Sequence, residues 1–281
     1  MTQRSKAIAF MCGGVLMLVM NDTAAKWLLD RYDPLQIAFM RSALALPIVT
    51  GLVIMSSGSG GFRSGRVSIH ALRALLVVVA TMAFFRALRT MSLAEATSLL
   101  FTAPIIVAAL IALFTKERVN ARRWGSVLLG FIGVLIIVRP GVEAFRPASL
   151  YALLAAFLYA LVLISARSVH PRDGLWTMTF YMTVFSVGFG AVTLGWVWPD
   201  LLTSDAALFA VMAVMGTGGA AFISQAFRLA PASLVAPLDY SALLWASVMG
   251  WLVWGTVPGW SVYAGAAVIV ASGILLLRAE D

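Results

Sequence analysis

The sequence has few charged residues, one cysteine and two histidines. Lys, Arg, Asp and Glu make up 11% of its 281 residues, whereas they make up about 25% of a typical soluble domain. Cys12 stands alone, so no disulfide can form within the chain. His70 and His170 lie near the ends of apolar runs and form no ligand cluster, and no G-x-x-x-x-G-K-[ST] loop occurs. These absences argue against a metal centre and a P-loop nucleotide site.

Apolar residues dominate the chain. They make up 62% of it, and the mean hydropathy is +0.96, which is more apolar surface than a soluble domain of this length can bury. We therefore expect an integral membrane protein whose surroundings are a lipid bilayer. The net charge of +8 does not indicate nucleic-acid binding, because the Lys and Arg residues lie mostly in short connections between apolar runs, where they set orientation.

Runs of about 20 apolar residues predict membrane-spanning helices. The first run begins after Arg4 and Lys6 and continues to Leu28 without a small-residue cleavage site, so we interpret it as a span and not as a signal peptide. Counting Lys and Arg in alternate connections places both termini in the cytoplasm. The predicted spans are all-α and ten in number: 1–28, 34–55, 69–90, 93–115, 122–139, 148–168, 175–197, 205–228, 231–254 and 259–278.

The two halves of the chain resemble one another at an offset of about 140 residues. Asp33 corresponds to Asp173, Arg89 to Arg228, and the glycines of the fifth span to those of the tenth. Because each half holds five helices, an odd number, the halves cross the membrane in opposite senses. We therefore predict two inverted five-helix repeats, residues 1–140 and 147–281, with a substrate site near the midplane between them.

These patterns resemble the drug/metabolite transporter superfamily, EamA-type branch. The shared features are the ten spans, the steps from Arg89 to Glu95-Ala96 and from Arg228 to Leu234-Val235, and paired glycines in the last helix of each half. The resemblance implies a bacterial inner-membrane secondary transporter without ATP hydrolysis, bound metal or enzymatic activity. Within the superfamily, the chain is most similar to bacterial exporters of amino acids, including the aromatic amino-acid and paraquat exporters.

Charged groups inside the first two spans are candidates for a site, because each costs several kcal/mol in hydrocarbon and needs water or a partner. Asn21 and Asp22 lie beyond the middle of the first span, and Arg41 reaches a similar depth on the second. We expect an ion pair between Asp22 and Arg41. Either this pair joins two helices structurally, or it meets the ammonium and carboxylate of a zwitterionic substrate.

Asp239 is the sharpest candidate, because it lies in the ninth span next to Tyr240 and just after Pro237. Proline removes an intrahelical hydrogen bond and opens the helix toward a cavity. Three interpretations of Asp239 stay open. It is a neutral structural acid, a contact for a substrate ammonium group, or a site for a coupling proton.

Aromatic residues are expected near the same depth. Through the repeat, Phe101 matches Tyr240 while Leu100 matches Asp239, so only one half supplies an acid. Rings can stack on an apolar group or hold a cation over their faces, although they can equally pack between helices or face lipid. The remaining aromatic candidates are Phe84, Phe85, Tyr159 and Trp245.

Glycines of the eighth span, from Gly216 to Gly219, serve either as a hinge or as a close-packing surface. Packing faces are expected for the glycines of the last helix of each half, namely Gly125, Gly130, Gly133, Gly265 and Gly273.

The sequence predicts a monomeric exporter of small amphipathic metabolites, most simply aromatic or neutral amino acids, that works by alternating access. The alternative is an exporter of cationic drug-like compounds. A membrane enzyme would need a cluster of His, Asp or Glu at one membrane face, and the sequence contains none.

Overall fold

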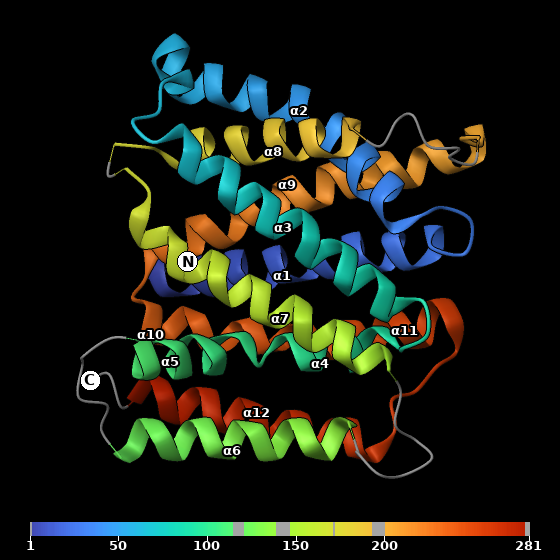
Figure 1. Ribbon diagram of the computed structural model, residues 1–281, viewed down its shortest axis with the longest axis vertical. Helices are drawn as coiled ribbons and strands as arrows, with labels where there is room; N and C mark the ends of the chain where they lie inside the picture. Colours follow the sequence, from blue (N-terminus) through green and yellow to red (C-terminus); the bar gives the residue numbers. More distant parts are fainter. Residues whose placement is uncertain (1, 115–120, 139–146, 171, 193–199, 279–281) are drawn as a thin grey trace.

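The computed structural model describes residues 2–114, 121–138, 147–170, 172–192 and 200–278, and within these ranges the secondary structure is entirely helical (Figure 1). Short 3-10 segments connect or interrupt several of the α-helices. The α-helices are α1 (Gln3–Leu28), α2 (Pro34–Ser57), α3 (Val67–Leu88), α4 (Leu93–Leu100), α5 (Ala103–Phe114), α6 (Ala121–Val138), α7 (Ala148–Ser165), α8 (Leu175–Ala191), α9 (Ala206–Leu229), α10 (Ala232–Val235), α11 (Ser241–Trp254) and α12 (Trp260–Arg278).

Several helix starts are encoded by local hydrogen-bonding residues. The side chain of Asp33 accepts a hydrogen bond from the backbone N–H of Leu35 at 2.9 Å, and Pro34 occupies the first turn of α2. At α4, Ser92 and Glu95 form a reciprocal capping box. Such caps satisfy backbone N–H groups that have no partner inside the helix, so they fix where each helix begins.

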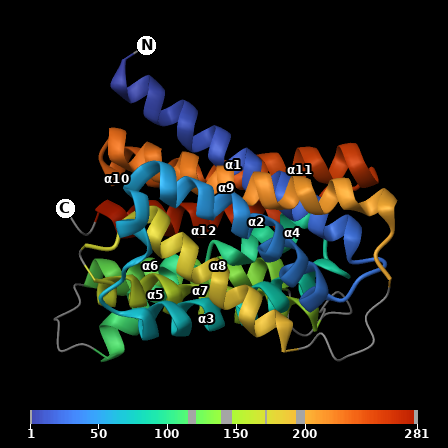
Figure 2. The same cartoon turned by 90° about the horizontal axis from the view of Figure 1, so that it is seen from above.

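The long helices lie roughly side by side, and each packs mainly on a helix from the other part of the chain (Figures 1 and 2). The main pairs are α1 with α9, α2 with α8, α3 with α7, α4 with α11, and α6 with α12. The start of α1 and the end of α12 lie at the same end of the bundle (Figure 1).

Glycines allow the closest of these contacts. A Cβ atom on Gly14 of α1 would lie 2.9 Å from the carbonyl oxygen of Gly219 on α9, and a Cβ on Gly219 would lie 2.9 Å from that of Gly14. Gly133 of α6 and Gly265 of α12 meet in the same way. Gly219 is therefore a packing residue, one of the two predicted roles for the glycines of this span.

The expectation of a packing face is wrong for Gly125, because a Cβ atom there would meet nothing within 4 Å. A glycine face needs an opposing backbone, and α6 meets α12 further along its length, at Gly133. Gly130 does pack, against Ile105 and Ser272, and Gly273 packs against the ring of Tyr240.

Two predicted spans are interrupted near their middles. The span 93–115 divides between α4 and α5, and the span 231–254 passes through α10 and a 3-10 segment, Ala236–Tyr240, before α11 begins. The interruptions meet, since the rings of Phe101 and Tyr240 lie edge to face with centroids 5.0 Å apart. Pro104 and Pro237 account for the breaks, because proline lacks the N–H that an α-helix needs.

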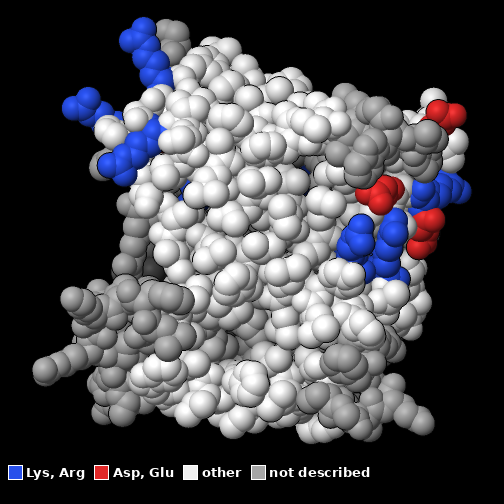
Figure 3. Space-filling model, in the orientation of Figure 1, with Lys and Arg blue, Asp and Glu red and all other residues white. Residues whose placement is uncertain are grey.

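The surface supports a membrane location. Lys, Arg, Asp and Glu gather at the two ends of the helices, and the band between them is almost free of charge on the face shown in Figure 3. Among the described residues, 6 helices are long and apolar enough to cross a bilayer, and α6 and α12 contain shorter apolar segments, Val127–Val138 and Trp260–Leu275. The division into ten spans and two inverted halves stays a prediction.

Candidate functional site

Tyr159 occupies an unusual place on α7. Successive residues of an α-helix are rotated by about 100°, so Ala152, Ala155, Ala156 and Ala160 share the side of α7 on which Tyr159 lies. Those four alanines are at most 1% exposed, yet Tyr159 is 48% exposed. Leu163, one turn further on the same side, is 40% exposed. The inward side of α7 therefore borders accessible space within the bundle.

Asp239 reaches this region from the interrupted span 231–254. The 3-10 segment before α11 carries it, and its side chain is exposed. Its charge acts on the hydroxyl of Tyr159. Neither Asp239 nor the Tyr159 hydroxyl has a hydrogen-bond or ion-pair partner among the residues that the structure describes. We call the region bordered by Tyr159, Leu163 and Asp239 the central opening.

The predicted aromatic residues divide into two groups. Phe84, Phe85 and Phe101 are buried in the main hydrophobic core, with 6%, 1% and 6% exposure. Tyr240 and Trp245 are half-buried and pack against that core. Of these rings, Phe101 packs edge to face on Tyr240, the residue after Asp239. Contact of any of the five with a substrate stays a prediction.

Asn21, Asp22 and Arg41 lie on α1 and α2. The side-chain amide of Asn21 donates to a carboxylate oxygen of Asp22 at 2.9 Å. The charges of Asp22 and Arg41 act on one another, but the structure does not contain the expected direct ion pair between them. The predicted ion pair is therefore wrong, because equal depth on two neighbouring helices does not by itself bring the two side chains into contact.

Arg73 is a buried cation near the central opening that the sequence interpretation overlooked. Its side chain is on α3, is 8% exposed, and donates from Nη1 to the carbonyl oxygen of Val162 at 2.8 Å and to Oγ of Ser165 at 3.1 Å. Its charge also acts on Tyr159. A signal was available, since Arg73 is a charged residue inside the predicted span 69–90.

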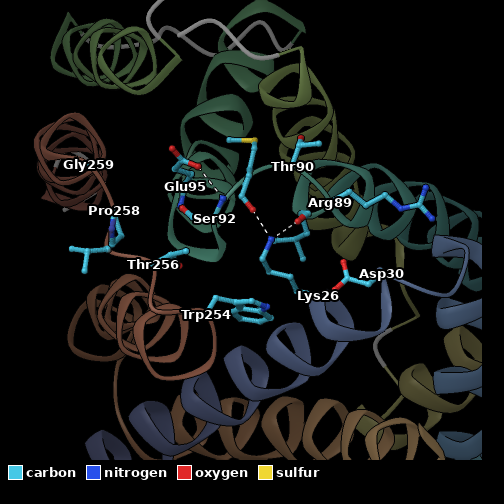
Figure 4. A pocket seen from close by; sticks show the side chains of 13 residues that line it. Lys26, Asp30, Arg89, Thr90, Ser92, Glu95, Trp254, Thr256, Pro258 and Gly259 are labelled. Carbon is cyan, nitrogen blue, oxygen red and sulfur yellow. Dashed lines mark hydrogen bonds between the residues drawn. The ribbon is translucent and has the colours of Figure 1, made fainter.

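A pocket of about 420 Å³ opens at the end of the bundle opposite the termini (Figures 1 and 4). Lys26 crosses it and donates from Nζ to the carbonyl oxygens of Leu88 and Met91 at 2.5 and 2.7 Å. The same ammonium lies 5.6 Å from the ring centre of Trp254. Lys26 thus joins α1 to the α3–α4 turn and to α11, and the sequence interpretation did not single it out.

A buried polar cluster ties two connections together at the end where the termini lie. Oγ of Ser64 donates to a carboxylate oxygen of Asp173 at 2.7 Å, and Nε2 of His70 lies 3.0 Å from the same oxygen. The rings of His70 and Tyr181 stack with centroids 5.2 Å apart. Burial raises the pKa of Asp173, but the hydrogen bonds from Ser64 and His70 outweigh it, so this pKa lies below its ordinary value.

No group of three or more His, Cys, Asp or Glu side chains that could hold a metal ion occurs in the part of the chain that the structure describes. The polar groups available at the central opening are a carboxylate, a phenol and a guanidinium. They can bind the charged and hydrogen-bonding parts of a small organic molecule.

Comparison with known proteins gives consistent results. A model of the EamA-like transporter family matches residues 5–139 and again residues 146–278. An S-adenosylmethionine uptake transporter of Rickettsia bellii is 24% identical over 265 residues, which cover 92% of this chain and 89% of that protein. A riboflavin transporter of Vibrio cholerae is 29% identical, with 87% and 83% covered. A solved crystal structure at 16% identity aligns with a TM-score of 0.62 over 97% of each chain, a likeness in fold alone.

Proposed function

The chain belongs to the EamA-like transporter family, and we propose that this multi-pass membrane transporter carries small amphipathic metabolites with an amino-acid head group through the central opening by alternating access. The observation that carries the proposal is that Tyr159 and Asp239, whose charge acts on the Tyr159 hydroxyl, both lie at the central opening. A phenol and a carboxylate without protein partners border accessible space inside an apolar bundle. Both groups are exposed to that space and neither is engaged by the protein, so a ligand that enters it can supply their hydrogen-bonding and ionic partners.

The substrate class follows from the chemistry of the opening. A carboxylate attracts an ammonium or sulfonium group, and the half-buried rings of Tyr240 and Trp245 suit a planar or apolar body. Aromatic and neutral amino acids meet this description, and so does S-adenosylmethionine, which joins an amino-acid head to a sulfonium and an adenine ring. The relatives described above are named for S-adenosylmethionine and riboflavin, not for amino acids or drugs, so we extend the class to amino-acid-bearing metabolites.

Alternating access is supported by the way the helices pair. Each long helix of the first part packs mainly on one from the second, and the family model matches the chain twice. We propose that residues 1–140 and 147–281 are inverted repeats whose relative movement exposes the central opening to one side and then the other. The sequence predicts that both termini are cytoplasmic and that the protein exports its substrate. The Rickettsia relatives, by contrast, are named for uptake.

The test is counterflow into proteoliposomes, which detects transport whatever its direction. Vesicles preloaded with unlabelled compound take up the labelled form only if the protein exchanges it. Labelled S-adenosylmethionine, phenylalanine and riboflavin are compared, with Asp239→Asn as the test variant and the exposed Asp200→Asn as its matched control. We expect counterflow of an amino-acid-bearing compound that Asp239→Asn reduces at least about 10-fold, the loss that follows when a charged contact becomes neutral. No protein-dependent counterflow of either amino-acid-bearing compound would overturn the proposal.

A second candidate function is export of cationic drug-like compounds. It is favoured by one observation, that Asp239 has no cationic partner within the described residues. Methyl viologen, which has two positive charges and no carboxylate, distinguishes the two functions in the same assay. Exchange of methyl viologen without exchange of phenylalanine or S-adenosylmethionine would favour the drug exporter.

A further inference from the structure

Arg73 has hydrogen-bonding capacity that the protein does not use. A guanidinium carries five N–H groups, and both hydrogen bonds of Arg73 are made by Nη1, to α7. Nε is buried and has no hydrogen-bond partner. Nη2 likewise makes no hydrogen bond to any part of the chain that the structure describes. A side chain that is only 8% exposed therefore keeps a free edge formed by Nε and Nη2.

That edge has the geometry of a carboxylate site. Two parallel N–H groups on a planar guanidinium match the two oxygens of a carboxylate, and such bidentate pairs are among the strongest hydrogen bonds in proteins. A buried N–H group without a partner is costly, so an unfilled edge calls for an acceptor. The bonds from Nη1 to Val162 and Ser165 hold the guanidinium in place, because they anchor it to the last turn of α7.

The anchored guanidinium lies beside the central opening. Val162, whose carbonyl oxygen accepts from Arg73, is one helical turn beyond Tyr159, and residues at this spacing are neighbours on a helix surface. The charges of Arg73 and Asp239 both act on Tyr159, from α3 and from the segment before α11. A cation and an anion thus lie within electrostatic reach of one phenol, and each belongs to a different part of the chain.

We propose that the Nε–Nη2 edge of Arg73 binds the carboxylate of the transported metabolite while Asp239 binds its cationic group, so that the central opening selects zwitterions. The proposal rests on the function proposed above and sharpens it, since Asp239 alone would accept an amine as readily as an amino acid. Arg73 then has two roles: its Nη1 hydrogen-bonds to α7, and its Nε–Nη2 edge binds the carboxylate of the ligand.

The test compares ligands that differ only in the carboxylate. Counterflow of phenylalanine is measured against phenylalanine methyl ester, and S-adenosylmethionine against its decarboxylated form, in wild type, Arg73→Lys and Arg73→Gln. We expect wild type to prefer each free carboxylate by about 10- to 100-fold in apparent affinity, as for a charged bidentate contact. Arg73→Gln removes this preference, and Arg73→Lys, which keeps the charge but loses the fork, retains part of it. Because the readout is a ratio within one variant, lower expression does not affect it.

Two matched variants separate ligand binding from a structural role. Ser165→Ala removes one anchor of Nη1 and leaves the free edge, and Arg86→Gln changes an exposed arginine at the other end of α3. Arg86→Gln should keep the wild-type preference, and Ser165→Ala, which retains the Val162 anchor of Nη1 and the free edge, should keep most of it. Equal apparent affinity for the acid and its ester in wild type, or an unchanged ratio in Arg73→Gln, would overturn the inference while leaving the proposed transport function intact. Absence of counterflow for all four compounds would instead count against the proposed function itself.

Discussion

Tyr159 and Tyr32 differ in whether their hydroxyls have hydrogen-bond partners within the protein. Tyr32 is 1% exposed, and its hydroxyl donates to Asp205 at 2.9 Å and accepts from the backbone of Leu202 at 3.1 Å. The Tyr159 hydroxyl has no such partners in the described part of the chain. The first therefore serves the fold, and the second is free for a ligand.

Replacing each tyrosine by phenylalanine should separate these roles. Tyr32→Phe removes the buried donor of Asp205, which keeps its contact with Arg31, and leaves the N–H of Leu202 without its acceptor. We therefore expect a loss of about 1–3 kcal/mol in the free energy of unfolding. Tyr159→Phe should change that free energy by less than about 0.5 kcal/mol and raise the half-saturating substrate concentration about 5-fold or more, the value of roughly one hydrogen bond. Thermal unfolding in detergent and counterflow measure the two effects. Equal destabilisation by both changes would contradict the account.

The cluster of Ser64, His70 and Asp173 predicts a pH dependence of stability. The pKa of Asp173 in the folded protein lies below 3.8, its ordinary value. A lowered carboxyl pKa contributes stability that is fully present above the unfolded value and is lost as the pH falls through the folded value. We therefore expect wild type to lose stability below about pH 4, whereas Asp173→Asn is less stable at neutral pH and loses less on acidification. Unfolding midpoints in detergent at pH 7, 5 and 3 test this, with the exposed Asp200→Asn as control.

At the scale of residues, the sequence shows which side chains have unusual chemistry better than it shows which residues contact them in space. Asp239 can be singled out because a charged group in an apolar run is costly, whereas Tyr159 was a candidate only as an aromatic ring. Arg73 and His70 were missed because their importance depends on residues roughly 90 to 100 positions away, such as Val162 and Asp173. The predicted Asp22–Arg41 ion pair was wrong for a different reason: equal depth on two helices does not fix the rotation of either helix.

At the scale of elements, packing is governed by where small residues meet. The α1–α9 pair depends on Gly14 and Gly219, each of which lies against the backbone of the other. The ranges of the long helices could be predicted from apolar runs, and the interruptions near Phe101 and Tyr240 from the prolines beside them. The contact of Gly133 with Gly265, and the absence of one at Gly125, could not, because it depends on how far along their lengths two helices touch.

Alanine at Gly219 should weaken the α1–α9 contact. The new Cβ would lie 2.9 Å from a backbone oxygen that cannot rotate away, so α1 and α9 must separate, at a cost of about 1–3 kcal/mol. Gly51→Ala in α2 is the matched control, because its Cβ would meet nothing within 4 Å and alanine favours helix. Thermal unfolding in detergent should show a lower midpoint for Gly219→Ala and an unchanged or higher one for Gly51→Ala. The reverse order would contradict the packing described.

At the scale of the whole molecule, two tethers hold opposite ends of the bundle. Lys26 joins α1 to the α3–α4 turn beside the pocket of Figure 4, and the Asp173 cluster joins the α2–α3 and α7–α8 connections at the other end. A transporter that alternates must loosen contacts at one end at a time. Lys26 bonds α1 to the α3–α4 turn in this conformation, so we expect it to restrain opening at the end opposite the termini.

Removing the ammonium of Lys26 should favour opening at that end. Lys26→Met keeps the apolar stem but loses both hydrogen bonds to the α3–α4 turn. We expect a membrane-impermeant thiol reagent added at that side to reach a cysteine at position 163 at least about 3-fold faster than in the unchanged background, with Lys6→Met, exposed at the other end, as control. An unchanged rate would mean that Lys26 does not close the opening.

The central claim is that the inward side of α7 faces a water-filled substrate path, and two leucines of α7 test it directly. Leu163 and Leu154 are 40% and 44% exposed, but they lie on opposite sides of the helix. Each is replaced by cysteine in a Cys12→Ser chain, and alkylation by a membrane-impermeant reagent is timed in proteoliposomes with and without the exchanged substrate. The account predicts that Leu163→Cys reacts and is protected by substrate, while Leu154→Cys, facing lipid, does not react. Equal reactivity at both positions, or no protection at 163 by a substrate that the variant still exchanges, would contradict it.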